Sequence, residues 1–518
     1  MPSAAGDRPR PGAEKVAAGP GLGHGRGMRL GIDFGTTRTV VAAVHDGRHP
    51  LAVFDDDGEF RDHVPGIAAW KDGALLVGWP AARALADGSA EHAIRSIKRV
   101  IGTLAPDAPV PGLPGVTALG LATAFFADLH AALRERSTLD VDAGAPLEVM
   151  AAVPANAPSR QRWLTLEALR RAGFAPLGLL NEPTAGALDF AHRHLELGRK
   201  SPKKYVVVYD LGGGTFDTSA VSLQGRLFDL IATAGLARLG GDDFDQLILD
   251  AAGVEATAAT LERARVAKES LAPTTRKLLL DLGDREPITL DTAALYARAQ
   301  PLIDATLAQL DGLFAGLRAR GIDPDDPREL GGIYLVGGGA AFPAVARTLR
   351  ARYARKLQLA PQPFAATAIG LALAADPDAH LLIREAVTRH FGVWREADAG
   401  ADKVFDPLLG KDAAGPLVVE RRYRPAHPVG HLRFLECGAL DAAGQPVQDL
   451  VPCDDIYFPY DPALADRDEL ATVPNHRKVE LMANEIVETY TYGRDGAISV
   501  RIENRSRGYG RTYQLGAG

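Results

Sequence analysis

The chain has 518 residues, of which 46% are hydrophobic and 24% are charged, and its formal net charge is −7 at pH 7. Such a composition is typical of a globular protein with two or more domains, and it excludes a fibrous or wholly disordered chain. The negative charge, without any basic cluster, argues against nucleic acid as a main partner.

The cysteines and the first residues indicate the compartment. Cys437 and Cys453 have neither the spacing of a metal site nor that of a disulfide framework, so we expect a reducing cytoplasm. Residues 1–27 are rich in Gly, Pro, Ala and Arg, and they predict a disordered leader without the apolar core of a secretory signal. Because no apolar stretch is long enough to span a bilayer, we expect no membrane partner.

Beyond the leader, strand and helix signals alternate, as expected of an α/β protein. Residues 28–43 predict a hairpin in which Asp33 ends an apolar strand and Gly35 makes the turn. Thr36 and Thr37 then offer hydroxyl and N–H groups to an anion. The pattern matches neither the P-loop nor the dinucleotide-binding motif, so a phosphate site here is of another kind.

Several residues in the next stretch have an ordinary interpretation beside a functional one. Lys98 lies in a helical segment, where a solvated helix face is the usual place of a lysine. Pro154 ends a strand, and Arg162 lies on the next helix among basic residues that are explained equally well as surface charges. Glu182 precedes Pro183, so we expect it on an extended residue just before a helix, where it either caps the helix or points into a cleft.

Residues 205–221 predict a second hairpin, in which two buried strands flank a glycine-rich turn. The glycines of this turn are Gly212, Gly213 and Gly214. Without a Cβ they let backbone N–H groups converge on a phosphate, and Thr215 adds a hydroxyl. Asp210 and Asp217 flank the turn and are suited to hold the waters of a Mg²⁺ ion that bridges phosphate oxygens. The alternative is an ordinary glycine hairpin.

The two hairpins share one design, which indicates an internal duplication and a nucleotide clamped between two related lobes. A third glycine turn follows a buried strand at residues 333–336. Its members are Gly337, Gly338 and Gly339. Such a turn lets the backbone lie against a flat ligand such as a nucleoside, and a plain strand-to-helix turn is the alternative.

Seven short motifs follow one another in the chain, namely GIDFGTTRT, IKRVIG, VPA, NEPTAGA, DLGGGTFD, LGGDDFD and LVGGG. In this order they resemble the ATPase domain of the heat shock protein 70 (DnaK-type) chaperone family, within the actin-like superfamily. The resemblance covers about residues 28–375, and NEPTAGA with DLGGGTFD is its most specific part. It implies two lobes, each built on a ribonuclease-H-like sheet, with ATP or ADP and Mg²⁺ in the cleft between them.

The resemblance assigns roles by position. The carboxylates around the metal are matched by Asp33, Asp210 and Asp217. The two phosphate loops are matched by Thr36, Thr37, Gly212, Gly213 and Thr215. Lys98 and Glu182 match the pair that orients the attacking water. Pro154 and Arg162 match the residues that relay the nucleotide state to the peptide-binding domain. These roles suit phosphoryl transfer, which requires positioning and charge neutralisation rather than a covalent nucleophile.

The sequence departs from the family at the adenosine pocket. Where the family usually has a Lys, a basic stacking residue and a Ser on one helix, this chain has Lys268, Glu269 and Ala272. The family's Ser-Thr-Arg after the third glycine turn is here Gly339, Ala340 and Ala341, which removes an arginine that stacks on the base. Phe364 replaces an acid near the same pocket. We therefore expect Lys268 to bind nucleotide, but with an affinity weakened by a factor of roughly tens and an open choice of base.

The rest of the chain predicts a β-rich domain. Residues 381–387 (LLIREAV) resemble the family's interdomain linker, with a helix end as the alternative, and we place the linker at residues 381–390. From residue 391 to residue 518, short alternating runs indicate a sandwich-like fold. Residues 487–504 resemble the last strands of the family's peptide-binding domain, and because no long helix follows we expect its helical lid to be missing.

We therefore expect an α/β protein with a two-lobed, actin-like ATPase domain at residues 28–380, followed by a smaller β-rich domain. The resemblance implies an ATP-dependent molecular chaperone, in which slow Mg²⁺-dependent hydrolysis controls the binding of unfolded or extended polypeptide. It also implies a J-domain co-chaperone and an exchange factor as partners. A regulatory or structural actin-like protein with little turnover is the first alternative. A small-molecule kinase is the second, although a kinase would usually lack both NEPTAGA and the β-rich tail.

Overall fold

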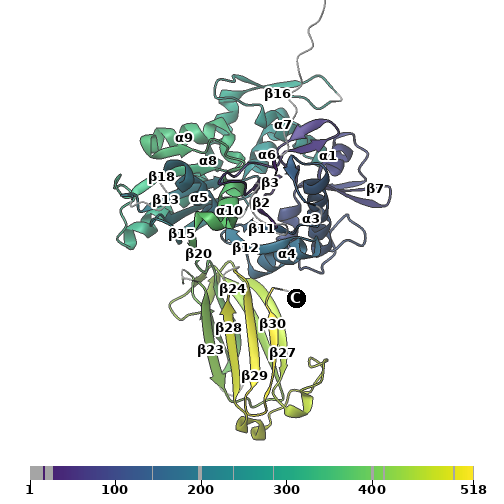
Figure 1. Cartoon of the computed structure of the whole chain (residues 1–518), viewed down its shortest axis with the longest axis vertical. Coiled ribbons are helices and arrows are strands. Elements are labelled where there is room, and N and C mark those ends of the chain that lie inside the picture. Colours follow the sequence, from purple (N-terminus) through teal and green to yellow (C-terminus); the bar gives the residue numbers. More distant parts are fainter. Residues whose placement is uncertain are drawn as a thin grey trace, which may run out of the picture.

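The computed structural model of the chain (Figure 1) describes residues 16–17, 27–142, 144–195, 201–236, 238–283, 285–397, 402–411, 413, 415–493 and 496–516. It has a mixed α/β body and a smaller β-rich domain below it in this view. Most of the predicted leader lies outside the described residues, apart from β1 (Val16–Ala17), which pairs with β10 (Leu139–Asp140). None of the helices in these ranges is long and apolar enough to cross a membrane.

Two sheets of the same design form the α/β body. The first runs in the order β12 (Ala175–Asn181), β11 (Leu147–Val153), β2 (Met28–Phe34), β3 (Arg38–Ala43) and β6 (Val64–Pro65). The second runs in the order β19 (Leu357–Leu359), β18 (Leu330–Val336), β13 (Tyr205–Leu211), β14 (Phe216–Ser222), β15 (Leu227–Leu236) and β20 (Leu382–Arg384). In each sheet an antiparallel hairpin, β2–β3 or β13–β14, stands beside two parallel strands. The strand order therefore repeats, in agreement with the duplication that the two hairpins indicate.

Helices cover these sheets. Within the described residues they are α1 (Gly78–Ala86), α2 (Ile97–Ile101), α3 (Ala118–Glu135), α4 (Ser159–Arg171), α5 (Glu182–His194), α6 (Gly241–Ala252), α7 (Ala258–Glu269), α8 (Thr292–Ala319), α9 (Pro343–Tyr353) and α10 (Ala366–Ala375). The short strands are β4 (Phe54–Asp56), β5 (Glu59–Arg61), β7 (Ala68–Lys71), β8 (Ala74–Val77), β9 (His92–Ile94), β16 (Lys277–Leu280) and β17 (Ile288–Asp291). Our placement of Glu182 before a helix was wrong by one residue, because Glu182 is the first residue of α5 and the extended Asn181 is its N-cap. Pro183 fits inside the first turn, where no backbone N–H has a helical partner.

Each sheet has its own hydrophobic core, and a third core joins the two. α3 and α4 pack on the first sheet around Phe125 and Phe126, and α6, α7 and α8 pack on the second around Phe244 and Leu310. The helices α5 and α10 lie between the sheets (Figure 1), and residues of both belong to the third core. They approach so closely that a Cβ on Gly370 would lie 1.8 Å from the carbonyl oxygen of Ala185.

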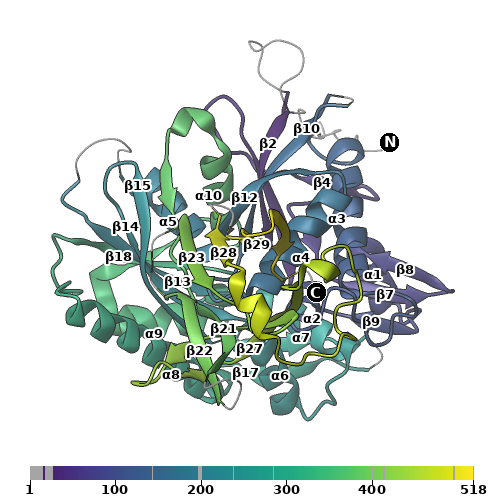
Figure 2. The ribbon, with the colours of Figure 1, turned by 90° about the horizontal axis from the view of Figure 1, so that it is seen from below.

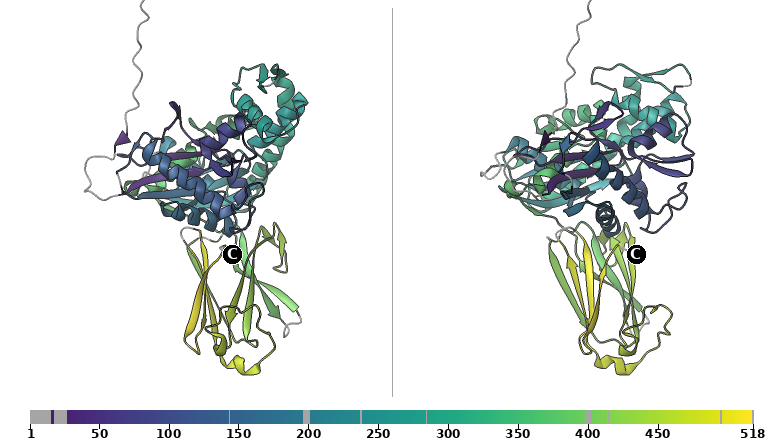
Figure 3. Two further views of the ribbon diagram at one scale, coloured as in Figure 1. Left: turned by 90° about the vertical axis from the view of Figure 1, so that its right-hand side faces the viewer. Right: turned by 45° about the vertical axis from the view of Figure 1, so that its right-hand side comes forward.

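The C-terminal domain consists of two four-stranded sheets, which Figure 3 shows side by side. One runs β22 (Asp402–Leu409), β21 (His390–Ala397), β24 (Val429–Cys437) and β27 (Val451–Pro459), and the other β23 (Leu417–Tyr423), β28 (Ile486–Tyr492), β29 (Ile498–Asn504) and β30 (Tyr509–Gln514). A separate hairpin pairs β25 (Ala439–Leu440) with β26 (Pro446–Gln448). Alternating side chains of the two sheets, among them Phe391, Phe434 and Ile502, form one core between them.

The contact between α5 and α10 gives a prediction about stability. We expect Gly370→Ala to destabilise the fold by about 1–3 kcal/mol, because the added methyl group meets backbone that cannot move aside alone. Gly312→Ala, at an exposed position of α8 with nothing within 4 Å of the new Cβ, is the matched control and should be neutral or slightly stabilising. Urea unfolding of both variants checks this. Equal unfolding midpoints for the two would contradict the close approach.

Candidate functional site

A cleft opens where the turns of the two hairpins face each other. The predicted site residues that line it are Asp33, Gly35, Thr36, Thr37, Lys98, Glu182, Asp210, Gly212, Gly213, Thr215, Lys268, Gly337, Gly338 and Gly339. The remaining predicted residues are not among those that line the cleft, namely Gly214 in the glycine-rich turn, Asp217 on β14, Pro154 and Arg162. The structure thus brings together residues that are more than 300 positions apart in the sequence.

The two phosphate loops are in direct contact. A Cβ on Gly213 would lie 2.1 Å from the Thr37 hydroxyl oxygen, so only glycine allows the loops to meet. The LGGDDFD turn supports the second loop from behind, since the N–H groups of Gly241 and Asp242 donate to the carbonyls of Gly212 (2.9 Å) and Gly213 (2.7 Å). These glycines therefore have a structural role in addition to leaving room for a phosphate.

The third glycine turn also lies close to the site. Gly337 has a φ of +87°, and a Cβ there would lie 2.4 Å from the Asp210 carboxylate. A side chain at this position would be both strained and in collision. Asp210 is thereby fixed at the end of β13, and it pairs in register with Asp217 on β14.

Lys98 and Glu182 form a buried ion pair in the centre of the cleft. Lys98 is 6% exposed and Glu182 8% exposed, and the ammonium donates to a Glu182 carboxylate oxygen. Lys98 comes from α2, a short helix capped by Ser96, and Glu182 from the first turn of α5. The ordinary interpretation of Lys98 as a solvated surface charge is therefore wrong in this fold.

Several carboxylates lie close to this ion pair and to one another. Burial, and then the Glu182 charge, raise the pKa of both Asp33 and Asp217 to about 7, although Lys98 acts in the opposite direction. The pKa of Asp210 is also raised by burial and by its acidic neighbours. Burial alone would lower the pKa of Lys98, but the surrounding carboxylates outweigh burial and hold it above its usual value. A site with this charge distribution attracts further positive charge.

The donor set fits a hydrated divalent cation. Within the described residues, no three His, Cys, Asp or Glu side chains converge as direct ligands of one metal ion. Mg²⁺ commonly keeps several waters, and the half-buried Asp33 and the buried Asp210 and Asp217 are suited to hold such waters. A bound Mg²⁺ would supply neutralisation of phosphate charge at this position.

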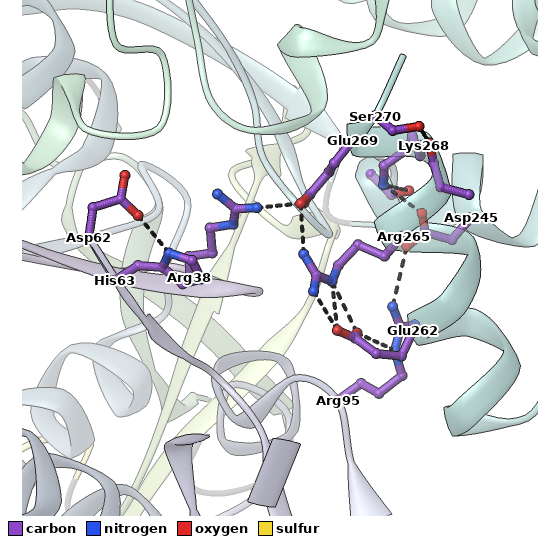
Figure 4. Close-up of polar contacts among 12 residues, drawn as sticks. Arg38, Asp62, His63, Arg95, Asp245, Glu262, Arg265, Lys268, Glu269 and Ser270 are labelled. Carbon is purple, nitrogen blue, oxygen red and sulfur yellow. Dashed lines mark hydrogen bonds and ion pairs between the residues drawn. The ribbon is translucent and has the colours of Figure 1, made fainter. Parts of the chain in front are cut away.

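The cleft is also lined by residues that the sequence did not single out as ligands. These are Arg38, Gly241, Arg265, Pro363 and Thr367. Arg38 could have been noticed because it directly follows Thr37, and Arg265 because it lies one helical turn before Lys268 and Glu269. Lys268 lines the cleft as predicted, but its ammonium is already paired with Asp245 (2.6 Å) and with the Gly241 carbonyl (2.7 Å) (Figure 4).

Arg162, one of the two residues predicted to relay the nucleotide state, lies close to the β-domain, since a Cβ on Gly496 would lie 3.0 Å from its guanidinium. Seen from below (Figure 2), this domain lies over α4. Its residue Glu436 accepts hydrogen bonds from the backbone N–H (3.1 Å) and the hydroxyl of Ser159, the first residue of α4. Pro158, the N-cap, has no side-chain hydrogen bond to offer, so an acid from another domain completes the N-terminus of this helix.

A second contact links the linker to the cleft. Strand β20 within the predicted linker pairs with β15, so the alternative of a helix end is wrong. The next residue, Glu385, is buried and accepts from the backbone N–H (2.8 Å) and side-chain amide (2.6 Å) of Asn181. Arg162 donates to the same Asn181 side chain (2.6 Å). Because Asn181 directly precedes Glu182, the linker contacts the segment that positions the buried ion pair.

The ion pair gives a prediction about stability. We expect Lys98→Met to destabilise the unliganded protein by about 3–5 kcal/mol at pH 7, because Glu182 then keeps a buried charge without a partner. The double variant Lys98→Met/Glu182→Gln should recover most of the loss. Denaturant unfolding of the two single variants and the double variant checks the coupling. Additive losses would mean that the two side chains do not interact.

Comparison with known sequences agrees with this geometry. The family model described as "Hsp70 protein" matches residues 29–111 and 136–379. The chaperone protein HscA of Serratia proteamaculans (strain 568) is 32% identical over 418 residues, and the match covers 72% of this chain and 63% of that protein. HscA of Salmonella newport (strain SL254) is 33% identical over 406 residues, with the same coverage. The chain thus spans about 63% of the length of these curated relatives. Because the family match contains both phosphate loops and the Lys98–Glu182 pair, the chain belongs to the Hsp70 family.

Proposed function

We propose that this protein is an ATP-dependent molecular chaperone of the Hsp70 type, in which a Mg²⁺-dependent ATPase domain controls polypeptide binding by the β-domain. The observation that carries the proposal is the direct contact of the two phosphate loops around the buried Lys98–Glu182 pair. Family membership and the similarity to HscA chaperones support it. The finer description as a two-lobed, actin-like fold is supported by the repeated strand order of the two sheets.

The chain's own residues account for the proposed chemistry. The N–H and hydroxyl groups of Thr36, Thr37 and the second phosphate loop bind and orient the triphosphate. Mg²⁺ would neutralise its charge near the buried aspartates. Lys98 and Glu182 hold a water in line with the terminal phosphate, where Glu182 can accept a hydrogen bond from it. No group acts as a covalent nucleophile, as phosphoryl transfer permits.

The docked β-domain supports coupling between nucleotide and client. Contacts from Glu436 to Ser159 and from Glu385 to Asn181 tie this domain and its linker to strands and helices that also position the site. If nucleotide favours this docked arrangement, linkage requires that a client change nucleotide affinity by the same factor. A J-domain co-chaperone, an exchange factor and a cytoplasmic location belong to the proposal as well. The two cysteines are free and buried, which suits a reducing compartment.

The alternative function is a regulatory actin-like protein that binds nucleotide with little turnover. The altered residues of the adenosine pocket favour this alternative, since a protein that binds nucleotide weakly is less suited to repeated cycles of ATP hydrolysis. A sugar-kinase-like activity has no comparable support, because the docked β-domain and its linker contacts have no role in it. Turnover and client binding separate the two remaining functions.

The first prediction concerns hydrolysis. We expect slow Mg²⁺-dependent ATP hydrolysis that falls about a hundredfold or more in Asp210→Ala, because this change removes a charge beside the metal that corresponds to about 3 kcal/mol of transition-state stabilisation. Asp304→Ala, on the exposed face of α8, is the matched control and should hydrolyse ATP like the wild type. Single-turnover assays measure the rates. Equal, near-zero turnover in wild type and Asp210→Ala, with nucleotide still bound, would favour the regulatory alternative.

The second prediction concerns coupling. We expect the full chain to bind labelled extended peptides, with lower affinity in ATP than in ADP, and we expect Glu436→Ala to reduce this difference because α4 loses its cap from the β-domain. Glu420→Ala, on β23 away from the contact, should keep it. Fluorescence anisotropy with ATP, with ADP and without nucleotide measures the affinities. Absence of peptide binding in every state would remove the chaperone function, and binding that ignores nucleotide would remove the coupling.

A further inference from the structure

The cleft has two ends that differ in their free hydrogen-bonding groups. At the phosphate end, backbone N–H groups and hydroxyls converge on open space between the loops. At the other end, which we call the base end, the lining comes from Arg38, Arg265, Lys268, Glu269 and Phe364 beside the third glycine turn. Because the triphosphate occupies the first end, the base of a bound nucleotide must lie at the second.

The charged side chains of the base end are paired with one another (Figure 4). Arg38 of β3 pairs with Glu269 of α7, which also accepts from Arg265 (2.9 Å). Arg265 makes further hydrogen bonds to Glu262 (3.0 Å). With Lys268 held by Asp245, each basic side chain at this end is already engaged in at least one ion pair.

The uncharged groups of this end include an aromatic ring, three backbone carbonyls and one hydroxyl. The ring of Phe364 lies under the Arg38 guanidinium at 4.5 Å and against the backbone of Gly338. The carbonyls of Gly337, Gly338 and Gly339 all accept hydrogen bonds from the next residues of the same turn. Thr367 contributes a hydroxyl that can turn to donate or to accept, so it fits either kind of base edge.

One donor at this end has no partner. The Nε of Arg38 is buried and makes no hydrogen bond within the described part of the chain. A single donor suits the ribose and phosphate oxygens, which all nucleotides share, and acceptors that every base carries. It therefore does not distinguish adenine from the other bases.

The shape of the base end also allows bases of different size. Behind the third glycine turn lies an apolar cavity of about 440 Å³, lined in part by Ala340, Ala341 and Pro343. Pro363 borders both this cavity and the cleft. Small side chains at these positions provide no wall that would admit a purine and reject a pyrimidine.

We propose that this site takes nucleoside triphosphates with little selectivity for the base, because its binding groups act on the triphosphate and its base end presents paired charges and a stacking surface. Strong selection requires polar groups that the wrong base leaves unpaired, which can discriminate by about 10⁴-fold. Stacking tolerates every base, because each has a π-face. The inference rests on the proposed nucleotide site and names its substrate class.

Titration calorimetry of the full chain with the Mg²⁺ complexes of ATP, GTP, CTP and UTP tests the proposal. We expect four dissociation constants within about thirtyfold of one another. A preference of more than about thirtyfold for any one base would overturn the inference while leaving the proposed function intact. Failure of all four to bind would overturn the proposed nucleotide site itself, so the two failures are distinguishable.

A gain-of-selectivity variant tests where the base lies. Ala272→Ser/Ala341→Arg restores the hydroxyl and the stacking guanidinium of the family's pattern, the second of them at a residue that lines the cavity behind the third glycine turn, and we expect it to raise the preference for ATP over CTP at least tenfold. Ala319→Arg, at the exposed end of α8, adds the same charge far from the cleft and should leave the preference unchanged. An unchanged preference in the double variant, with all nucleotides still bound, would overturn the placement of the base at this end.

Discussion

The burial of several carboxylates around one ammonium is the constraint on which the rest of the structure depends. Asp33, Asp210 and Glu182 come from three separate elements, and Lys98 lies among them with little access to water. Buried like charges are costly unless they are compensated, so this arrangement persists only because the surrounding fold positions each group. The surplus negative charge favours a cation at this position, which is where we propose that Mg²⁺ binds. The site is therefore suited to bind a positively charged group, and the two sheets hold the carboxylates in place.

The same frame explains why distant contacts matter to the site. Asn181 is both the N-cap of α5, which begins with Glu182, and the partner of Glu385 in the linker. Ser159 opens α4 and receives its cap from Glu436 in the β-domain. A rearrangement of the β-domain must break these hydrogen bonds, and the contact at Asn181 is next to Glu182 in the cleft. These contacts are where we propose that the two domains are coupled.

The two ends of the cleft are restricted in different ways. At Gly213, in the loop that we propose to bind phosphate, a Cβ would meet the Thr37 hydroxyl group. The end that we propose for the base is lined by mutually paired charges around Glu269. Close packing therefore restricts the residue types at the first end. The second places fewer demands on residue identity, because stacking on a flat surface tolerates different side chains.

The sequence by itself determined the α/β character and the two hairpins, because glycine turns flanked by Asp and Thr depend on local backbone geometry. It also placed Asp210 and Asp217 on the two sides of one turn, and the structure shows that they pair in register. Only the tertiary structure decided that Lys98 is buried against Glu182 rather than solvated on a helix face, since their contact joins α2 to α5. It alone placed Arg38 against Glu269 and Glu436 on Ser159. Such pairings depend on how the sheets and domains pack, and no local pattern in the chain encodes the partner of a single charged side chain.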